Sequence, residues 1–444
     1  MSDPVHHFLK ELKEKKLILS EEGRFCTASQ FVSHIEEKAK RLSLKGKRVY
    51  FSLERSIESF EWFFALLKSG ALVFLGSPLF SHEKLKLLFD YLEPHLAILP
   101  RFQSSPFDSS KMQEFSGSLV SFPWSCKKEL DSQEQKAQIG ILTSGTTGSP
   151  RAVLHRFPSL LLNASFHAEA IQLNASDRVG SALPLHFSYG LVAVALASLV
   201  QGSSLFFAPP FIPGDPLVWM KEISVFSATP LLAKKMDRFP SRILTIGGDF
   251  TPPSLAEKIL HQAPHLTLFT TYGLTEAGPR VATCKISQED CLKTSLPLGT
   301  FLPSIETQIA EDQELLIKTP SVMLGYFRSA QETDAVFTKR WLHTGDLVKK
   351  QGDQFFFLGR KKRLLSLGGE KIYPAEIESL FQKIPFIEDA YVTQEDEKIV
   401  AYLQTSKPPE EKSIFSFLKN HLPRAQIPTN IAFVNELPIG ARKK

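Results

Sequence analysis

Short apolar runs alternate with longer amphipathic segments over the first hundred residues of the chain. Residues 49–53, 71–75 and 96–99 are apolar runs of strand length, whereas residues 56–69 and 82–92 carry apolar side chains at helical spacing. Repeated strand and helix units with short connections predict an α/β fold. In such a fold a doubly wound, parallel sheet is covered by helices on both faces.

The same alternation returns in the middle of the chain after a polar stretch. Residues 101–137 contain several serines, and we expect them to form a surface excursion. Two helices are predicted next, one at residues 160–172 and a buried one at 190–199. The strand-like runs of this region are residues 139–142, 152–155, 204–207, 224–227, 243–246 and 266–269. Ligands of such sheets gather where the strands end, so the loops after these runs are candidate sites.

The pattern changes toward the end of the chain. Residues 352–358 are typical of a hairpin, and the basic segment 359–363 is typical of a linker. The elements predicted beyond it are a helix at 374–382, strands at 390–393 and 399–403, a helix at 412–421 and a strand at 431–434. We therefore expect a large α/β N-terminal domain at 1–358, a linker at 359–363 and a small, mobile α+β C-terminal domain at 364–444.

Composition agrees with a globular protein of two or three domains. The chain has 444 residues, of which 43% are hydrophobic and 22% charged, and its formal net charge is +5. Its four cysteines form no Cys-x-x-Cys pair, which argues against a zinc site or a disulfide framework and favours a cytoplasmic location. The first residues lack a signal-peptide pattern, and the longest apolar stretch, 191–200, is too short for a membrane span. The mild positive charge suits anionic small molecules as well as nucleic acid.

The segment 141–153 places hydroxyl groups and glycines between two apolar runs. Hydroxyl groups can bond a phosphate, glycines let backbone N–H groups approach it, and an arginine adds positive charge. The candidate phosphate-binding residues are Thr143, Ser144, Gly145, Thr146, Thr147, Gly148 and Arg151. A P-loop would need a lysine directly after the last glycine and a helix behind it, and this segment has neither. The alternative is a polar hairpin turn.

Two further clusters carry groups suited to a nucleotide. After the run 266–269, Tyr272 could stack on a purine, Thr275 could bond a phosphate and Glu276 could hold a divalent cation. The alternative there is a strand-terminating turn with a solvated glutamate. Asp346 follows a glycine, so its carboxylate could accept both hydroxyl groups of a ribose or could cap a turn.

The region around the predicted linker combines basic residues with a pair of glycines. Gly368 and Gly369 allow a backbone to approach a ligand closely, and Pro374 is suited to the start of a helix. The basic run 360–363 is typical of a solvated turn or of a nucleic-acid patch.

In this order, these segments resemble the adenylate-forming superfamily of acyl- and aryl-CoA synthetases, luciferases and peptide-synthetase adenylation domains. The matching motifs are TSGTTGSPRAV, YGLTE, HTGD, GRKKR and GGEKIYPAEIE, and the resemblance covers residues 20–444. It implies that a carboxylate attacks the α-phosphate of MgATP to give an acyl-adenylate, from which a thiol displaces AMP. The implied cofactors are ATP, Mg²⁺ and CoA or a pantetheinyl carrier protein. The implied partner is a small carboxylic acid rather than nucleic acid or a membrane.

The resemblance also implies roles for individual residues. Those implied to bind ATP are Thr143, Ser144, Gly145, Thr146, Thr147, Gly148, Arg151, Gly247, Gly248, Tyr272, Gly273, Asp346 and Arg360. Those implied to be catalytic are Thr275, Glu276 and Lys443, with Glu276 as the Mg²⁺ ligand. Those implied to contact the acid or the pantetheine arm are His186, Gly190, Gly368 and Gly369. Lys362 falls at the hinge about which the small domain of the family swings.

The chain departs from the family pattern at several points. Arg151 and Ala152 replace the usual Lys-Gly, and the arginine keeps the charge and can bond phosphate. His186 precedes Phe187 where many members have the aromatic residue first, which leaves open which of the two lines the acyl pocket. A lone histidine beside apolar residues is more often a packing residue. Residues 183–190 contain no carboxylate, which disfavours a substrate with an α-amino group.

The end of the chain departs most from the family pattern. The family usually closes with a Gly-Lys whose lysine reaches the carboxylate and the α-phosphate, whereas here Ala441 follows Gly440. Lys443 is the first choice for that role, and Lys444 and Arg442 are alternatives. The other interpretation is a disordered basic tail without a catalytic lysine.

We therefore expect an AMP-forming carboxylate ligase that makes an acyl- or aryl-thioester, with CoA as the expected acceptor. Fatty acid metabolism is one pathway that the resemblance suggests. The compact length is similar to that of o-succinylbenzoate–CoA ligases. The alternatives are a ligase that loads a carrier protein, a degenerate nucleotide-binding protein without activity, and a nucleic-acid binder that uses the basic run.

Overall fold

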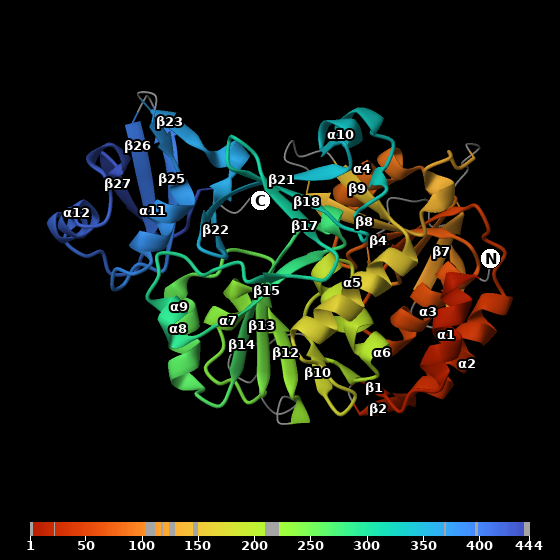
Figure 1. The fold of residues 1–444 in the computed structure, drawn as a ribbon. Coiled ribbons are helices and arrows are strands. Elements are labelled where there is room, and N and C mark those ends of the chain that lie inside the picture. The colour runs from red at the N-terminus through yellow and green to blue at the C-terminus, as the bar shows by residue number, and fades with distance from the viewer. Residues whose placement is uncertain are drawn as a thin grey trace.

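The computed structural model describes residues 3–21, 23–103, 112–116, 119–123, 129–144, 150–208, 222–367, 370–395 and 398–438. The described residues form two large sheets, a third smaller sheet and a C-terminal α+β unit (Figure 1). The chain passes between the two large sheets more than once, because the second sheet contains β1 and β2 and the first contains β19. Within these ranges no helix is both long and apolar enough to cross a lipid bilayer.

The first large sheet has eight strands. In spatial order they are β19 (Gly325–Tyr326), β9 (Pro150–His155), β8 (Ile139–Ser144), β4 (Leu72–Gly76), β3 (Arg48–Ser52), β5 (Leu96–Pro100), β7 (Leu119–Pro123) and β6 (Gln113–Ser116). The four central strands, β8, β4, β3 and β5, are parallel, and antiparallel strands extend both edges. The strands β8 and β9 form the predicted strand–loop–strand unit of the candidate phosphate loop.

The second large sheet has nine strands and is parallel over its centre. In spatial order they are β16 (Thr300–Phe301), β15 (Arg280–Lys285), β14 (Thr267–Gly273), β13 (Ile243–Gly247), β12 (Val225–Ala228), β10 (Arg178–Ser181), β11 (Ser204–Phe207), β1 (Ile18–Glu21) and β2 (Arg24–Thr27). The strands from β14 to β1 are parallel, so the carboxyl ends of β12, β13 and β14 lie at one edge of the sheet.

Helices lie between and around these sheets. They are α1 (Pro4–Lys13), α2 (Ala28–Lys40), α3 (Ile57–Lys68), α4 (His82–Leu92), α5 (Phe157–Ala170), the π-helix η3 (Tyr189–Leu196), α6 (Ala197–Gln201), α7 (Pro230–Lys234), α8 (Pro253–Gln262), α9 (Gln288–Cys291) and α10 (Ala330–Ala335). Short 3-10 turns occur at η2 (Glu134–Lys136), η5 (Thr275–Ala277), η6 (Lys361–Arg363) and η7 (Arg424–Gln426).

The largest hydrophobic cluster joins both sheets through helices α3, α5 and η3. It contains Val49 and Leu75 of the first sheet, Val179 and Val225 of the second, and aromatic side chains such as Phe64 from α3. Burial of this continuous apolar surface stabilises the two sheets as one body. The predicted buried helix at 190–199 is confirmed, although its first two turns are π-helical.

A third sheet leads to the C-terminal unit. It consists of β17 (Glu306–Ile309), β18 (Glu314–Lys318), β21 (Trp341–Gln351), β20 (Phe337–Thr338) and β22 (Gln354–Arg360). The strands β21 and β22 form the hairpin that the sequence predicts.

The C-terminal unit has its own core. It contains β23 (Leu365–Leu367), β24 (Glu370–Ile372), α11 (Pro374–Phe381), β25 (Asp389–Glu395), β26 (Lys398–Gln404), α12 (Glu411–Lys419) and β27 (Asn430–Val434). Its hydrophobic cluster draws only on residues of this unit, including Ile377, Ala401 and Ile414. The predicted α+β composition is confirmed, and the unit lies to one side of the two large sheets (Figure 1).

Three expectations are corrected. Residues 101–137 include β6 and β7, which extend the first sheet because Leu119, Val120 and Phe122 are buried against it. The strand β14 continues through Gly273, so Thr270–Gly273 belong to the strand rather than to a turn after it. The strand β22 continues through Arg360, so the segment 359–363 is a strand end and a 3-10 turn rather than an irregular linker.

Candidate active site

Three residues from distant motifs meet where β14 faces the β21–β22 hairpin. The hydroxyl group of Tyr272 donates a hydrogen bond to Asp346 (2.6 Å), and Asp346 pairs with Arg360 across the hairpin (3.0 Å). Asp346 is 1% exposed. Burial, and then the negative charge of Asp346, raise the pKa of Tyr272 well above its usual value, so the phenol keeps its proton. The tyrosine predicted for adenine and the two residues predicted for ribose therefore form one cluster.

Thr275 lies in the η5 turn directly after β14. Its hydroxyl group is 3.0 Å from that of Ser188, and its carbonyl oxygen lies 2.9 Å from Nε2 of His155. Because a carbonyl can only accept, this contact requires the proton of His155 to sit on Nε2. Burial lowers the pKa of His155 to about 4, so the ring is neutral at pH 7. The turn that carries Thr275 is thus fixed from β9 and from the segment before η3.

Glu276 sits beside the strand that carries Arg151. Oε1 of Glu276 accepts a hydrogen bond from the hydroxyl group of Tyr326 (2.9 Å), and the guanidinium of Arg151 lies over the Tyr326 ring at 4.7 Å. Arg151 also pairs with Glu332 (2.7 Å). Oε2 of Glu276 makes no hydrogen bond to any residue within the described ranges. A carboxylate with one oxygen held and the other open suits a divalent cation such as Mg²⁺.

The structure describes only part of the candidate phosphate loop. Thr143 faces Arg151 across the β8–β9 pair, and the backbone of Ser144 pairs with that of Pro150. The other predicted loop residues, Gly145, Thr146, Thr147 and Gly148, lie outside the described residues, as do Gly368, Gly369, Arg442, Lys443 and Lys444.

The glycines at the ends of β13 and β14 are required by close packing. A Cβ atom on Gly247 would lie 2.3 Å from Oγ1 of Thr271, and one on Gly273 would lie 1.9 Å from the carbonyl oxygen of Pro279. Gly248 has a φ of +84°, in the left-handed region that favours glycine. These glycines bring the ends of the two strands and the η5 turn close together.

The residues of segment 186–190 differ from one another in burial. His186 is 7% exposed, and burial lowers its pKa to about 4, whereas Phe187 is 50% exposed. A Cβ atom on Gly190 would lie 2.3 Å from the carbonyl oxygen of Pro184, so close packing by itself accounts for a glycine at this position. His186 is therefore a neutral, buried ring, and Phe187 is the more accessible of the two aromatic side chains.

The basic run is explained by ion pairs. Besides the pair between Arg360 and Asp346, Lys361 pairs with Asp312 (2.6 Å) and Arg363 with Glu378 (2.6 Å). These pairs balance much of the charge that suggested a nucleic-acid patch.

Sequence reasoning missed two residues that contact the predicted ones. Tyr326 holds Glu276, but it lies fifty positions away and in no motif. Arg280 donates a hydrogen bond to Thr271 (2.8 Å) and is 3% exposed. The signal for Arg280 was a lone arginine followed by Val281 and Ala282 in a strand-like run.

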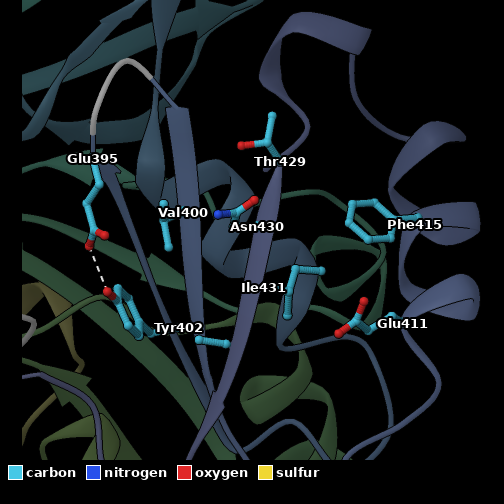
Figure 2. A pocket seen from close by; sticks show the side chains of 9 residues that line it. Glu395, Val400, Tyr402, Glu411, Phe415, Thr429, Asn430 and Ile431 are labelled. Carbon is cyan, nitrogen blue, oxygen red and sulfur yellow. Dashed lines mark hydrogen bonds between the residues drawn. The ribbon is translucent and has the colours of Figure 1, made fainter.

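A separate pocket lies in the C-terminal unit, between its sheet and α12 (Figure 2). Tyr402 donates a hydrogen bond to Glu395 there (2.7 Å), and Glu411 and Asn430 add polar groups. None of the predicted site residues lines this pocket, so it is distinct from the site described above.

Known proteins resemble this chain both in sequence and in structure. The sequence model of the family described as "AMP-binding enzyme" matches residues 7–327. A 2-succinylbenzoate–CoA ligase of Oceanobacillus iheyensis is 27% identical over 100% of this chain and 98% of its own length. A ligase of the same name from Bacillus licheniformis is 32% identical over 68% of this chain and 67% of its own length. Among solved structures, O-succinylbenzoate coenzyme A synthetase from Bacillus subtilis, in complex with ATP and magnesium ion, has a TM-score of 0.78 and 25% identity, covering 98% of this chain and 97% of that one.

These likenesses agree with the motifs and with the site. They confirm the predicted fold class, the predicted class of enzyme, and ATP, Mg²⁺ and CoA as its cofactors. The chain therefore belongs to the family of AMP-binding enzymes, as an AMP-forming acid–thiol ligase.

Proposed function

We propose that this ligase activates an aromatic carboxylic acid of the 2-succinylbenzoate type with MgATP and transfers the acyl group to CoA. The relatives named above support this acid, since both ligases and the solved synthetase carry it in their names. This proposal replaces the expected role in fatty acid metabolism. The lack of a carboxylate in residues 183–190 also fits an acid without an ammonium group.

The observation that carries the proposal is the convergence of four motifs on one edge of the second sheet. Tyr272 and Asp346 are hydrogen-bonded, and Thr275 and Glu276 follow directly in the η5 turn. The strand of the phosphate motif reaches the same place, because Arg151 stacks on the tyrosine that holds Glu276. Positioning and charge neutralisation are what transfer at a phosphoryl centre needs most.

Within this arrangement we assign the roles that the family implies. Thr143 to Gly148 and Arg151 hold the β- and γ-phosphates. Tyr272 lies against adenine, and Asp346 and Arg360 bind the ribose. Thr275 contacts the α-phosphate. Glu276 ligates Mg²⁺, which neutralises phosphate charge when bound.

We also propose that the C-terminal unit beyond residue 363 moves as a body about Lys362. Its separate core supports this, as does the polar character of its contacts with the rest of the chain. Glu376 pairs with Lys349 (2.9 Å), and the hydroxyl group of Ser379 donates to the carbonyl oxygen of Thr294 (2.9 Å).

The test is acid-dependent exchange of labelled pyrophosphate into ATP. We expect exchange with 2-succinylbenzoate and weaker or no exchange with short and long aliphatic acids. Absence of exchange with every acid would instead support the degenerate, non-catalytic alternative.

The acceptor is tested separately. The purified protein is supplied with 2-succinylbenzoate, ATP and either CoA or a pantetheinyl carrier protein, and the products are weighed by mass spectrometry. We expect the CoA thioester. Acylation of the carrier protein alone would support the carrier-loading alternative.

A further inference from the structure

The second sheet contains a buried arginine without a carboxylate partner. Arg280 is 3% exposed, and the ion pairs within the described ranges include none to it. The other buried arginine among the described residues is Arg48, which is 0% exposed and pairs with the buried carboxylate of Glu134 at 3.0 Å. A buried charge without a partner is costly, so such a group usually has a ligand or a function.

The contacts that Arg280 does make satisfy only part of its guanidinium. Nη1 donates to Oγ1 of Thr271 (2.8 Å), and the group lies over the ring of Tyr189 at 4.5 Å. Nε is buried and has no hydrogen-bond partner among the described residues. Burial lowers the pKa of Arg280, and the phenol of Tyr189 offsets part of that effect.

The groups around Arg280 are neutral. The hydroxyl group of Tyr189 lies 3.1 Å from that of Thr245, which in turn donates to Ser227 (2.8 Å). Burial, and then the charge of Arg280, lower the pKa of His167 to about 3, so this ring carries no charge at pH 7. Within the described part of the chain, the surroundings of Arg280 thus supply hydroxyl groups and a cation but no anion.

Arg280 also lies beside residues that the resemblance implies for the site. A Cβ atom on Gly247 would lie 3.0 Å from Nη1 of Arg280, so the end of β13 and the guanidinium are in direct contact. Thr271, its hydrogen-bond partner, is the residue before Tyr272 on β14. Tyr189 begins η3, directly after the segment that contains His186.

We propose that Arg280 is the specificity residue that binds the second carboxylate of a dicarboxylic aromatic substrate, the carboxylate that is not activated. This inference rests on the proposed function. An acid named 2-succinylbenzoate has two carboxylates, one on the ring and one on the succinyl chain, and one of them remains an anion after adenylation. The guanidinium supplies the charge and the fork of N–H groups that recognise a carboxylate.

The experiment compares acids that differ by one carboxylate. Pyrophosphate exchange is measured with 2-succinylbenzoate and with two monoacids, 3-benzoylpropanoate and 2-butanoylbenzoate, each of which lacks one of its carboxylates. A site that bonds a substrate group strongly rejects analogues without it, so the wild type should prefer the diacid to the better monoacid by roughly 100-fold or more in kcat/KM. Arg280→Met should lower kcat/KM for the diacid and reduce the preference to within about threefold, with the better monoacid little changed.

Two further variants keep the test informative. Arg280→Lys keeps the positive charge but loses the forked N–H groups of the guanidinium, so it should keep part of the preference for the diacid. It also provides the test if Arg280→Met does not fold. Arg242→Met removes a partly exposed arginine of the same sheet, paired with Asp177, and should leave the preference unchanged. Thermal unfolding midpoints are recorded for all variants.

The outcomes separate this inference from the proposed function. If Arg280→Met lowers kcat/KM equally for the diacid and for the better monoacid, and also lowers the unfolding midpoint, the residue has a structural role and the inference is overturned. An unchanged preference would also overturn it, while leaving the proposed function intact. Absence of exchange with every acid in the wild type would overturn the proposed function, and the inference with it.

Discussion

At the scale of single residues, the proposed ATP site depends on short contacts between side chains that the sequence places far apart. Asp346 is held from one side by Tyr272 and from the other by Arg360. The carboxylate of Glu276 accepts a hydrogen bond from Tyr326 alone among the described residues. Because a hydrogen bond to a charged group is stronger than a neutral one, each contact fixes the orientation of a carboxylate.

The carboxylate of Glu276 is the first residue to test. We expect Glu276→Gln to abolish pyrophosphate exchange while leaving ATP binding partly intact, because an amide keeps the shape but not the charge that a cation needs. Exchange and equilibrium binding of ATP, measured with and without Mg²⁺, check this. Unchanged exchange would remove Glu276 from the mechanism.

The contact from Tyr326 gives a graded prediction. Tyr326→Phe removes the only donor to Oε1 of Glu276 among the described residues, and we expect exchange to fall roughly tenfold with little change in stability. Tyr402→Phe is the matched control, because it removes a similar bond, to Glu395, in the pocket of Figure 2. Equal effects of the two variants would show that the contact at Glu276 has no special role.

At the scale of elements, the site is formed where strand ends and helix starts approach more closely than side chains normally allow. Gly247 at the end of β13 packs against Thr271 of β14, and Gly273 at the end of β14 packs against the carbonyl oxygen of Pro279. The start of η3 packs on the carbonyl oxygen of Pro184 through Gly190. The fold thus requires glycine at these positions whether or not the residues touch a ligand.

Gly190 separates a packing role from the substrate role that the resemblance implies. We expect Gly190→Ala to lower the free energy of unfolding by about 1–3 kcal/mol, because the new methyl group clashes with backbone that cannot rotate away. Urea unfolding measures this. Gly352→Asn is the control, since Gly352 has open space around it and a φ of +59° that asparagine tolerates. A stable Gly190→Ala variant with altered acid preference would favour the substrate role.

At the scale of the whole molecule, three neutral histidines are buried in the core that joins the sheets and the site. Burial lowers the pKa of His155 and His186 to about 4 and that of His167 to about 3. Both ring nitrogens of His167 lack a hydrogen-bond partner within the described ranges. Such groups oppose protonation in the folded state but not in the unfolded state.

This arrangement predicts a loss of stability in acid. Below the unfolded pKa of about 6.5 the unfolded chain binds protons that the folded chain does not, so stability falls as the pH drops from about 6.5 to about 4. His155 alone contributes up to roughly 3 kcal/mol to this fall. Urea midpoints measured against pH check it.

A variant attributes part of this loss to one residue. In acid, His167→Leu should reduce the slope of the free energy of unfolding against pH by the equivalent of about one proton, which is roughly 1.4 kcal/mol per pH unit. His7→Leu, at an exposed position, should leave the slope unchanged. An unchanged slope in His167→Leu would contradict the prediction.

The two-step reaction gives a second prediction at this scale. We expect Lys443→Ala to slow adenylation much more than thioester formation from preformed acyl-adenylate, because the family uses its C-terminal lysine only in the first step. The two half-reactions are measured separately. Equal slowing of both steps would argue against this role. The same two measurements on Lys444→Ala and Arg442→Ala test the two alternatives.

The sequence by itself determined the order of most strands and helices and the motif residues of the site. Apolar periodicity predicted α4 closely, and in the C-terminal unit it predicted α11, β25, β26, α12 and β27 but not the short strands β23 and β24. Local side-chain spacing fixes which face each predicted element buries. The motifs identified Tyr272, Glu276 and Asp346 because their chemistry is carried by the residues themselves.

Only the tertiary structure decided which groups meet. The strand β7 is a short apolar run inside a polar segment that resembles a loop, and pairing with β5, a non-local partner, holds it in the sheet. The polar strand β6 then pairs with β7. Tyr326 reaches Glu276 from fifty residues away. Arg280 looks like an ordinary strand residue in the sequence, and only the packing of α5, η3 and β13 around it shows a buried cation without an anion, because burial and pairing depend on the whole fold.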